Sequence, residues 1–288
     1  MRTFSRWMAL AVLVGGPAAY ADRNDIELSK LGNPGTDEYS APNTNFRAFA
    51  RTLGAMMTAT NLTPPETLGH AGFAVGLELG VVSMPEEVKL PMVNALEGPA
   101  LVPSIHVRKG LPFSIDLGAR VGWLDRSNLF AATGEVKWAV NEGFIPWLPD
   151  IGLRAHVTHL LNTRDFHLTA GGLDVNVGKQ FPLGGMISLT PYGGIDFVGV
   201  AAKSELLGFG PLDATGKPAD IAAYTPVNGW DNINTRFYAG GRFIGGALQI
   251  GAEVSLSSQG SIPTNAAGTE NRALAPVFAF STTLGLDF

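Results

Sequence analysis

Three histidines and one aspartate lie close together in the stretch HVTHLLNTRDFH, as His156, His159, Asp165 and His167. Imidazole and carboxylate groups in such proximity are the usual groups of acid–base catalysis and of zinc binding. His156 and His159 are three residues apart, so in a strand they would point to opposite faces and would not bind one ion together. The sequence also contains no G-x-S-x-G, H-E-x-x-H or phosphate-loop pattern. We therefore expect a solvated hairpin tip here, with no catalytic residue, no metal and no cofactor.

A second set of chemically capable side chains, mostly charged, alternates with apolar residues along the chain. In residues 113–123 the apolar side chains occupy the odd positions, whereas Asp116 and Arg120 occupy even positions. This period of two is typical of a β-strand with one apolar and one polar face. The polar face mixes small residues with both signs of charge, which suits an enclosed bore. The expected lumen-lining residues are Glu78, His106, Arg108, Asp116, Arg120, Glu135, Lys137, Arg154, His156, Asp174, Asp196, Arg236, Arg242 and Glu253.

About ten alternating segments of this kind follow one another, as in an outer-membrane barrel. Charged residues make up only 16% of the chain and glycines number 36, so little polar surface is available to face water. After the first residues, no stretch is long and apolar enough for a membrane helix, and a closed barrel is the alternative way to satisfy every backbone group in a bilayer. The sequence predicts an all-β, antiparallel, up-and-down transmembrane barrel of about 10 strands (range roughly 8–12) with a short N-terminal amphipathic helix. The segments lie near residues 69–83, 101–108, 113–123, 135–140, 151–158, 173–178, 186–202, 235–244, 247–257 and 274–288.

The connections between the segments differ in length at the two ends of the expected barrel. Long connections follow the first, seventh and ninth segments, at residues 84–98, 204–234 and 259–273, whereas the connections of the other end are short turns. This asymmetry is typical of long external loops and short periplasmic turns. The 204–234 loop could cover the external mouth, bind a partner or fold on itself. In the seventh segment, Pro191 and the pair Gly193-Gly194 predict a bend or bulge.

The first 21 residues have the features of an export signal. Arg2 and Arg6 precede the apolar stretch 7–14, and Ala19-Tyr20-Ala21 follows as an A-x-A cleavage site. We expect cleavage after Ala21, with residues 22–67 as a periplasmic tether and amphipathic helix and residues 68–288 as the barrel. The chain has no cysteine, which excludes a disulfide scaffold and a thiolate zinc site, and its net charge of −5 makes nucleic acid an unsuitable partner.

Residues 45–60 are expected to form the amphipathic helix. Phe46, Phe49, Ala50, Leu53, Met56 and Met57 would share one face, while Arg47, Arg51 and Thr52 would not. Asn45 could cap its start, and Pro64-Pro65 would prevent its continuation. Three positions are compatible with this pattern: a plug in the lumen, a helix at the inner membrane–water interface, and a helix packed on the periplasmic mouth. We favour the mouth or the interface, because a barrel of about ten strands leaves little room for a helix.

The C-terminal stretch FSTTLGLDF continues the alternation to the last residue. With the signal sequence and the alternating strands, it resembles the bacterial outer-membrane β-barrel proteins of Gram-negative cells, without pointing to a particular family. The resemblance implies that Phe280, Leu284, Leu286 and Phe288 form the signal read by the barrel-assembly machinery. It also implies location in the outer membrane and contact with its lipid.

The expected function is that of a non-enzymatic integral barrel. Its lumen could be a narrow, porin-like polar channel for ions or small solutes, or it could be filled by side chains in a structural or surface protein. One alternative is an outer-membrane hydrolase of protease or lipase type that uses the rim histidines and Asp165. Another is a soluble periplasmic binding barrel, in which the apolar parity would face inward.

Overall fold

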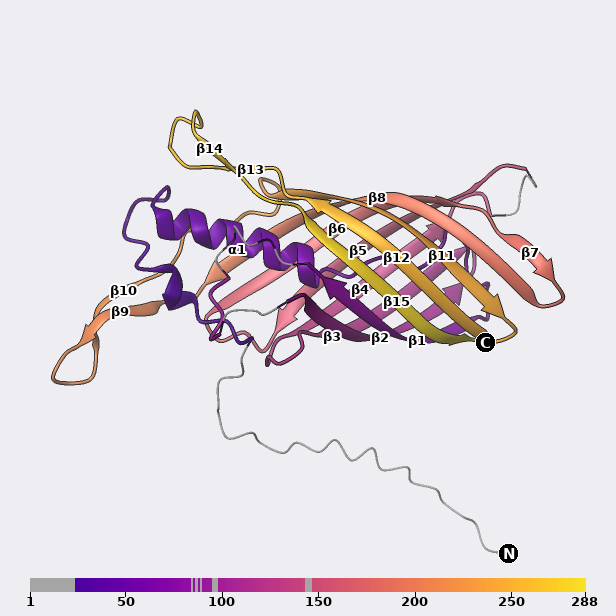
Figure 1. The fold of residues 1–288 in the computed structure, drawn as a ribbon, viewed down its shortest axis with the longest axis horizontal. Helices are drawn as coiled ribbons and strands as arrows, with labels where there is room; N and C mark the ends of the chain where they lie inside the picture. The colour runs from indigo at the N-terminus through magenta and orange to yellow at the C-terminus, as the bar shows by residue number, and fades with distance from the viewer. Residues whose placement is uncertain (1–23, 84, 86–87, 89, 95–97, 143–146) are drawn as a thin grey trace, which may run out of the picture.

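Ten antiparallel strands form a closed barrel in the computed structural model, which describes residues 24–83, 85, 88, 90–94, 98–142 and 147–288. The expected signal peptide lies outside the described residues. The strands tilt strongly around the barrel axis (Figure 1). The barrel strands are β1 (Phe73–Val82), β2 (Ala100–Leu111), β3 (Ile115–Trp123), β4 (Phe130–Ala139), β5 (Asp150–Leu161), β6 (Phe166–Gly178), β8 (Ile187–Ser204), β11 (Ile233–Gly245), β12 (Leu248–Ser258) and β15 (Val277–Asp287).

The first and last strands close the ring, which confirms the fold class. Each strand pairs with its neighbour in the chain, and β1 also pairs with β15, so that Val75 lies opposite Leu286. The terminal Phe288 exchanges both backbone hydrogen bonds with Phe73, at 2.8 and 2.9 Å. Closure leaves no free strand edge among the barrel strands, which a hydrocarbon environment requires.

The apolar parity of the strands faces outward. On β3, Leu117 and Val121 are 44% and 54% exposed, whereas Asp116 and Arg120 between them are 2% and 5% exposed. The other barrel strands repeat this alternation. The alternative of a soluble barrel with an apolar interior is therefore wrong, because the exterior is the apolar side.

Of the bend or bulge expected in the seventh segment, the bulge is absent. The register of β8 is continuous with β11 through residues 191–194 and with β6 from Tyr192 onward. Pro191 accepts a bond from Lys179 N just beyond the end of β6, and the N–H that it lacks would point to the same side, so the missing bond falls outside the β6–β8 ladder. The irregular register lies instead in the short strand β7 (Phe181–Gly184), which pairs with the start of β8.

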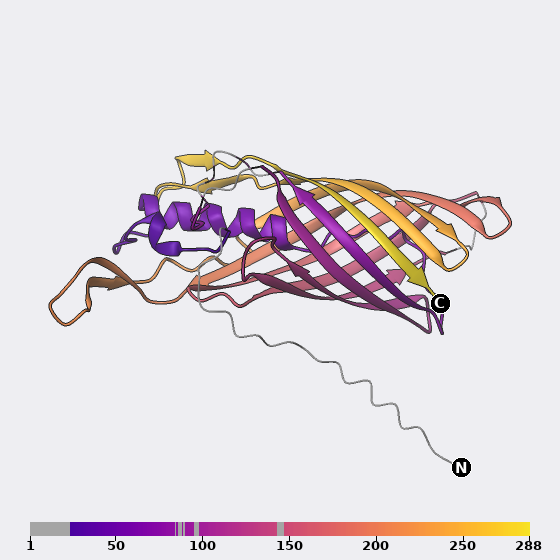
Figure 2. The same cartoon turned by 60° about the horizontal axis from the view of Figure 1, so that its bottom comes forward.

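The two ends of the barrel differ as expected from the loop lengths. One end carries the short turns and the C-terminus. At the other end, hairpins project beyond the barrel, formed by β9 (Leu207–Leu212) with β10 (Pro218–Ala222) and by β13 (Ser261–Pro263) with β14 (Asn271–Ala273) (Figures 1 and 2). The long 204–234 loop thus folds on itself in part, through the β9–β10 pairing.

The N-terminal region lies at the long-loop end and not at the short-turn mouth where we expected it. A 3-10 helix, η1 (Leu28–Leu31), precedes α1 (Ala41–Met57), and α1 lies across the long-loop opening with its last turn directed into the barrel (Figure 2). The helix begins earlier than residue 45, and Ser40 rather than Asn45 caps it by accepting a bond from Asn43 N. Within the described residues, we find no helix with the length and apolar character needed to cross a membrane.

Apolar contacts hold α1 in this opening. Phe46 stacks on Tyr224 of the long loop at 4.9 Å, and Phe49 meets the edge of Phe166 at 5.5 Å between ring centroids. Burial raises the pKa of Tyr224 to about 12, so its neutral hydroxyl donates toward the carbonyls of Leu28 and Gly32. The helix is therefore packed as a cap, and it closes the long-loop end of the barrel.

Arg51 shows why the interfacial position does not apply to this helix. The side chain is 4% exposed and does not face outward toward lipid head groups. Its guanidinium donates to Asn234 Oδ1 and to the carbonyls of Ile233 and Ser261, at 3.1 to 3.2 Å. The basic residue thus fastens the cap to the rim of the barrel.

Candidate functional site: the occupied bore

Residues 58–68 run through the bore and connect the cap at one end to β1 at the other (Figure 2). Asn61, Leu62 and Thr63 are each at most 3% exposed. These residues have no regular secondary structure, so their backbone groups lack the partners that a helix or sheet would supply. The barrel wall must supply those partners.

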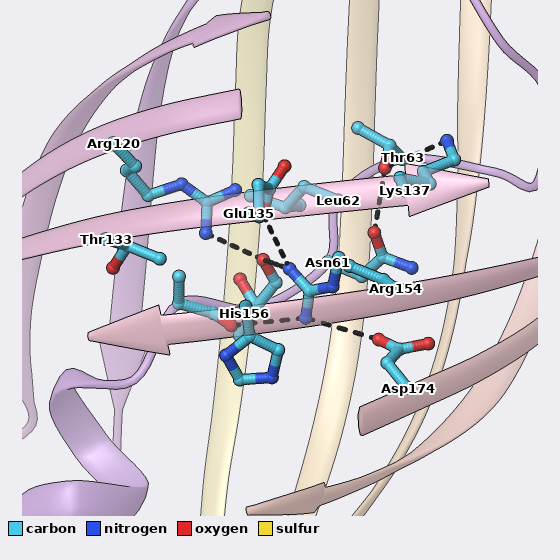
Figure 3. A network of polar contacts seen from close by, with 12 residues as sticks. Asn61, Leu62, Thr63, Arg120, Thr133, Glu135, Lys137, Arg154, His156 and Asp174 are labelled. Atoms are coloured by element: carbon cyan, nitrogen blue, oxygen red, sulfur yellow. Dashed lines mark hydrogen bonds and ion pairs between the residues drawn. The ribbon is translucent and has the colours of Figure 1, made fainter. Parts of the chain in front are cut away.

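Basic side chains of the wall donate to the backbone carbonyls of this inner segment (Figure 3). Arg120 Nη1 and Arg154 Nη1 both donate to the carbonyl of Thr60, at 2.7 and 3.2 Å. Lys137 donates to the carbonyl of Pro64 and to Thr63 Oγ1. Charged donors make stronger hydrogen bonds than neutral ones, and burial strengthens them further. These three wall cations are therefore engaged with the chain's own backbone.

Arg236 binds the end of α1. Its guanidinium donates to the carbonyls of Ala55, Thr58 and Ala59 at 3.0 to 3.2 Å, and it also lies 3.6 Å from Asp196. The last carbonyls of a helix lack intrahelical partners and carry the negative end of the helix dipole. A cation from β11 thus fixes the point where the helix gives way to the inner segment.

Acidic side chains bind the donors of the inner segment. Glu253 accepts from Leu62 N at 2.9 Å, and Asp116 accepts from Thr67 Oγ1 at 2.8 Å. Glu66, which belongs to the segment itself, pairs with Arg242 of β11 and accepts from Thr190 at 2.9 Å. Both signs of charge on the wall therefore have partners on the segment.

The remaining wall charges connect strand to strand. His106 lies between two carboxylates, with Nδ1 2.9 Å from Glu78 and Nε2 3.0 Å from Glu135. Arg120 Nη2 lies 3.1 Å from the same His106 Nδ1 and donates to Glu78 Oε1 at 3.2 Å, so the imidazole, the guanidinium and the two carboxylates form one connected cluster. Arg154 continues the chain of contacts from Glu135 at 3.0 Å to Asp174 at 3.2 Å.

Glycines of the wall leave space for the inner segment. A Cβ atom on Gly152 would lie 3.0 Å from Pro65 Cα, and one on Gly178 would lie 2.8 Å from Pro65 Cδ. Contacts this short would force the backbone or the proline ring to move. The wall is shaped at these two positions to hold Pro65.

Every residue of the expected lumen-lining set is buried, at 7% exposure or less, inside the barrel. The four residues of the expected assembly signal are exposed on its outside, between 42% and 71%. The rim histidines are not brought together. His156 lies in the bore and contacts Asp196 at 3.0 Å, His159 bonds Thr169 on the outer face, and His167 pairs with exposed Glu205. Among the described residues, no group of three or more potential ligands could hold a metal.

Sequence reasoning missed the inner segment, although two signals pointed to it. Residues 58–65 contain three threonines, two prolines and one asparagine, with a single large apolar residue, Leu62, so they do not fit a strand that contacts lipid. In addition, Val198, Val200 and Ala202 are apolar on the face of β8 that should be polar. An apolar inner face near the barrel's end indicates that something apolar covers it, and that element is α1.

Small spaces remain beside the segment. A cavity of ≈ 50 Å³ is lined by Met56, Thr60, Glu78 and Arg120 among others, which is room for a few water molecules. A recess of ≈ 530 Å³ lies at the short-turn mouth beside Glu66, Glu142 and Phe288. There, burial raises the pKa of Glu142, while the bond from Thr67 N opposes that rise.

Comparison with solved structures finds outer-membrane proteins that are similar to this chain at low sequence identity. No family model matches the chain, and no curated protein matches it. Neisserial surface protein A is 10% identical and matches 75% of this chain and 95% of its own, with a TM-score of 0.30. The outer membrane protein OprG from Pseudomonas aeruginosa is 11% identical over 77% of this chain and 99% of its own, also at 0.30. Outer membrane protein AlkL is 10% identical over 80% of this chain and 93% of its own, at 0.31.

Proposed function

We propose that this chain is an integral outer-membrane β-barrel that is closed by its own inner segment and presents its cap and long loops at the cell surface. In this proposal it is a structural or surface protein that acts on no separate substrate and has no open channel. The observation that carries the proposal is the occupation of the bore by residues 58–68, whose backbone binds the charged side chains of the wall.

The exterior supports placement in a bilayer. Large apolar side chains around the whole barrel are exposed, such as Leu77 at 61%, Leu173 at 66% and Leu284 at 54%. Soluble monomers rarely expose a contiguous apolar surface of this extent. Exposed aromatic side chains near the short-turn end, including Phe113 at 89% and Trp147 at 80%, suit a membrane–water interface. Phe144, an aromatic residue of the same turn as Trp147, lies outside the described residues.

The loop lengths support an orientation. Long loops of such barrels lie outside the cell and short turns lie in the periplasm. In that orientation Phe288 and the outward residues of β15 remain available to the barrel-assembly machinery at the periplasmic end. The cap, with residues 24–57, would then be on the cell surface.

Conductance tests the closure. In planar bilayers the refolded chain is expected to show no ion conductance, because the inner segment and the charged side chains that bind it fill the bore. Steady single-channel steps from the wild-type chain would show instead the narrow channel that the alternating pattern also allowed, and would overturn the proposal.

Thiol labelling provides a second test, since the chain has no cysteine of its own. Thr63→Cys, in the bore, should resist a water-soluble maleimide added from either side of the membrane. Asp213→Cys, in the exposed β9–β10 turn, should react rapidly and serves as the matched control. Equal labelling of the two cysteines would show that water and solutes pass through the bore.

A further inference from the structure

Leu62, in the middle of the inner segment, has a strained backbone. Its φ is 54°, in the left-handed region that residues with a bulky side chain rarely adopt, and the residue is 2% exposed. Such conformations are strained and are concentrated at functional sites. The residue before it is Asn61, whose side-chain amide can close a five-membered ring on its own backbone carbonyl carbon.

A path for a proton leads away from the Asn61 amide. Asn61 Nδ2 donates to the hydroxyl of Tyr238 at 3.0 Å, and Tyr238 donates to Asp174 Oδ1 at 2.5 Å. Thr63 Oγ1 donates to Asn61 Oδ1 at 2.7 Å and so fixes which amide atom faces Tyr238. Asp174 also pairs with Arg154 at 3.2 Å, and its carboxylate can accept a proton through Tyr238.

A carboxyl group lies on the other side of the same peptide bond. Glu253 Oε2 accepts from Leu62 N at 2.9 Å and from the Tyr192 hydroxyl at 3.1 Å. Within the part of the chain that the structure describes, no basic side chain is within ion-pair distance of Glu253, and its Oε1 has no hydrogen-bond partner. Burial without a cation favours the neutral form of a carboxyl group, and in Glu253 the proton would be on Oε1, because Oε2 accepts both hydrogen bonds. Rotation of the carboxyl group would bring that proton to the Leu62 nitrogen.

We propose that the Asn61–Leu62 peptide bond is a self-cleavage site. Asn61 Nδ2 attacks the carbonyl carbon of Asn61 and passes its proton through Tyr238 to Asp174. The bond from that carbon to Leu62 N breaks, and Glu253 gives its proton to the departing amine. The products are a C-terminal succinimide at residue 61 and a free amino group on Leu62, with no water consumed. One carboxylate gains the proton that the other carboxyl loses, so the step balances without a co-reactant.

The consequence is separation of the cap from the barrel. Residues 58–68 form the covalent connection between α1 and β1, so after cleavage the cap would be held only by its packing and by Arg51 and Arg236. This inference goes beyond the proposed closure and is tested by mass rather than by conductance. A barrel that conducts no ions can be either intact or cleaved after Asn61. Each of the two proposals can therefore fail without the other.

Intact-mass spectrometry tests the cleavage. The full processed chain, folded in detergent at neutral pH, is expected to give two fragments with the break after Asn61. Their masses at early times should add up to the uncut chain, whereas cleavage by a protease would add one water. A folded wild-type chain that stays intact, breaks elsewhere or gains water from the start overturns the proposal.

Variants identify the groups. Glu253→Gln keeps an acceptor for Leu62 N but has no proton to give, and Tyr238→Phe removes the acceptor of the amide proton. Because general acid–base catalysis contributes about 10²–10⁴-fold to a rate, each substitution should slow cleavage by about 100-fold or more.

Glu205→Gln and Tyr39→Phe, both at the surface, are the matched controls and should cleave at the wild-type rate. Heat-modifiable migration on detergent gels shows which variants fold. If Asn61 is cleaved equally fast in both bore variants, or in the urea-unfolded wild-type chain, the proposal is overturned.

Discussion

The cap and the inner segment are consecutive in the chain, yet the barrel holds them by different forces. Apart from the hydrogen bonds of Arg51 and Arg236, α1 is held by apolar packing, with Leu53 and Phe49 fully buried against the inner faces of β6 and β8. From residue 58 onward the contacts are hydrogen bonds from charged side chains such as Arg154. The change occurs where β8 itself changes, from Val198 and Val200 near the long loops to Asp196 deeper in the bore.

This difference follows from what each part of the chain can satisfy alone. A helix satisfies its own backbone and needs only an apolar surface for its side chains. An irregular segment leaves every backbone group unpaired, and each one that is buried without a partner costs about 1–3 kcal/mol. Cap and segment should therefore respond differently to substitution.

The largest effect is expected for Arg154→Ala. Its guanidinium contacts Glu135, Asp174 and the carbonyl of Thr60, and its loss leaves buried groups without compensation. Breaking such a buried pair costs about 3–5 kcal/mol, measured as a shift of the urea unfolding midpoint of the whole barrel. Arg126→Ala, which removes an exposed pair with Asp125, is the control and should leave the midpoint unchanged. Equal effects of the two substitutions would contradict a polar attachment of the segment.

Leu53→Ala should weaken the cap and leave the barrel intact. The side chain is fully buried, and truncating a buried leucine costs about 3 kcal/mol. Hydrogen exchange should become faster in residues 41–57 and stay slow in the barrel strands. If the barrel strands lose protection together with α1, the cap and the barrel form one cooperative unit, and the cap cannot be weakened separately from the barrel.

Gly54→Val should have a moderate effect that a second substitution reverses. A Cβ on Gly54 would lie 2.7 Å from Val200 Cγ2, so a valine overpacks the contact between α1 and β8 at a cost of about 1–3 kcal/mol. Val200→Ala in the same chain makes room for the new side chain and should restore much of the lost protection of α1. Strictly additive losses in the double variant would show that the helix does not contact β8 at this point.

Glu142→Gln should have the smallest effect, and its sign depends on pH. Burial raises the pKa of Glu142 in the folded chain, so the folded state binds this proton more tightly than the unfolded state. The Glu142 carboxyl group therefore contributes most to the stability of the folded state at a pH below its unfolded pKa. That contribution is lost as the pH rises through the folded pKa. The glutamine variant should be slightly more stable than the wild type at neutral pH and equal to it in acid, as thermal unfolding at two pH values can show. A stabilisation that is the same at both pH values would contradict this cause.

Much of the site could be predicted from the alternation alone. Asp116 and Arg120 point into the barrel because Leu117 and Val121 point outward. A shift of the strand register by one residue would reverse both directions. The position of the helix could not be predicted in this way. Its amphipathic pattern shows that one face must be covered, but a lipid interface, a barrel mouth and the upper part of a bore can all cover it.

The sequence by itself determined the barrel, its strands and the direction in which each side chain points, because a period of two is a local property of the backbone. The tertiary structure alone decided what fills the bore and from which end. Residues 58–68 find their partners on β3, β4, β5, β11 and β12, which come together only when the barrel closes. Contacts between groups so distant in the chain leave no periodicity in the residues that make them.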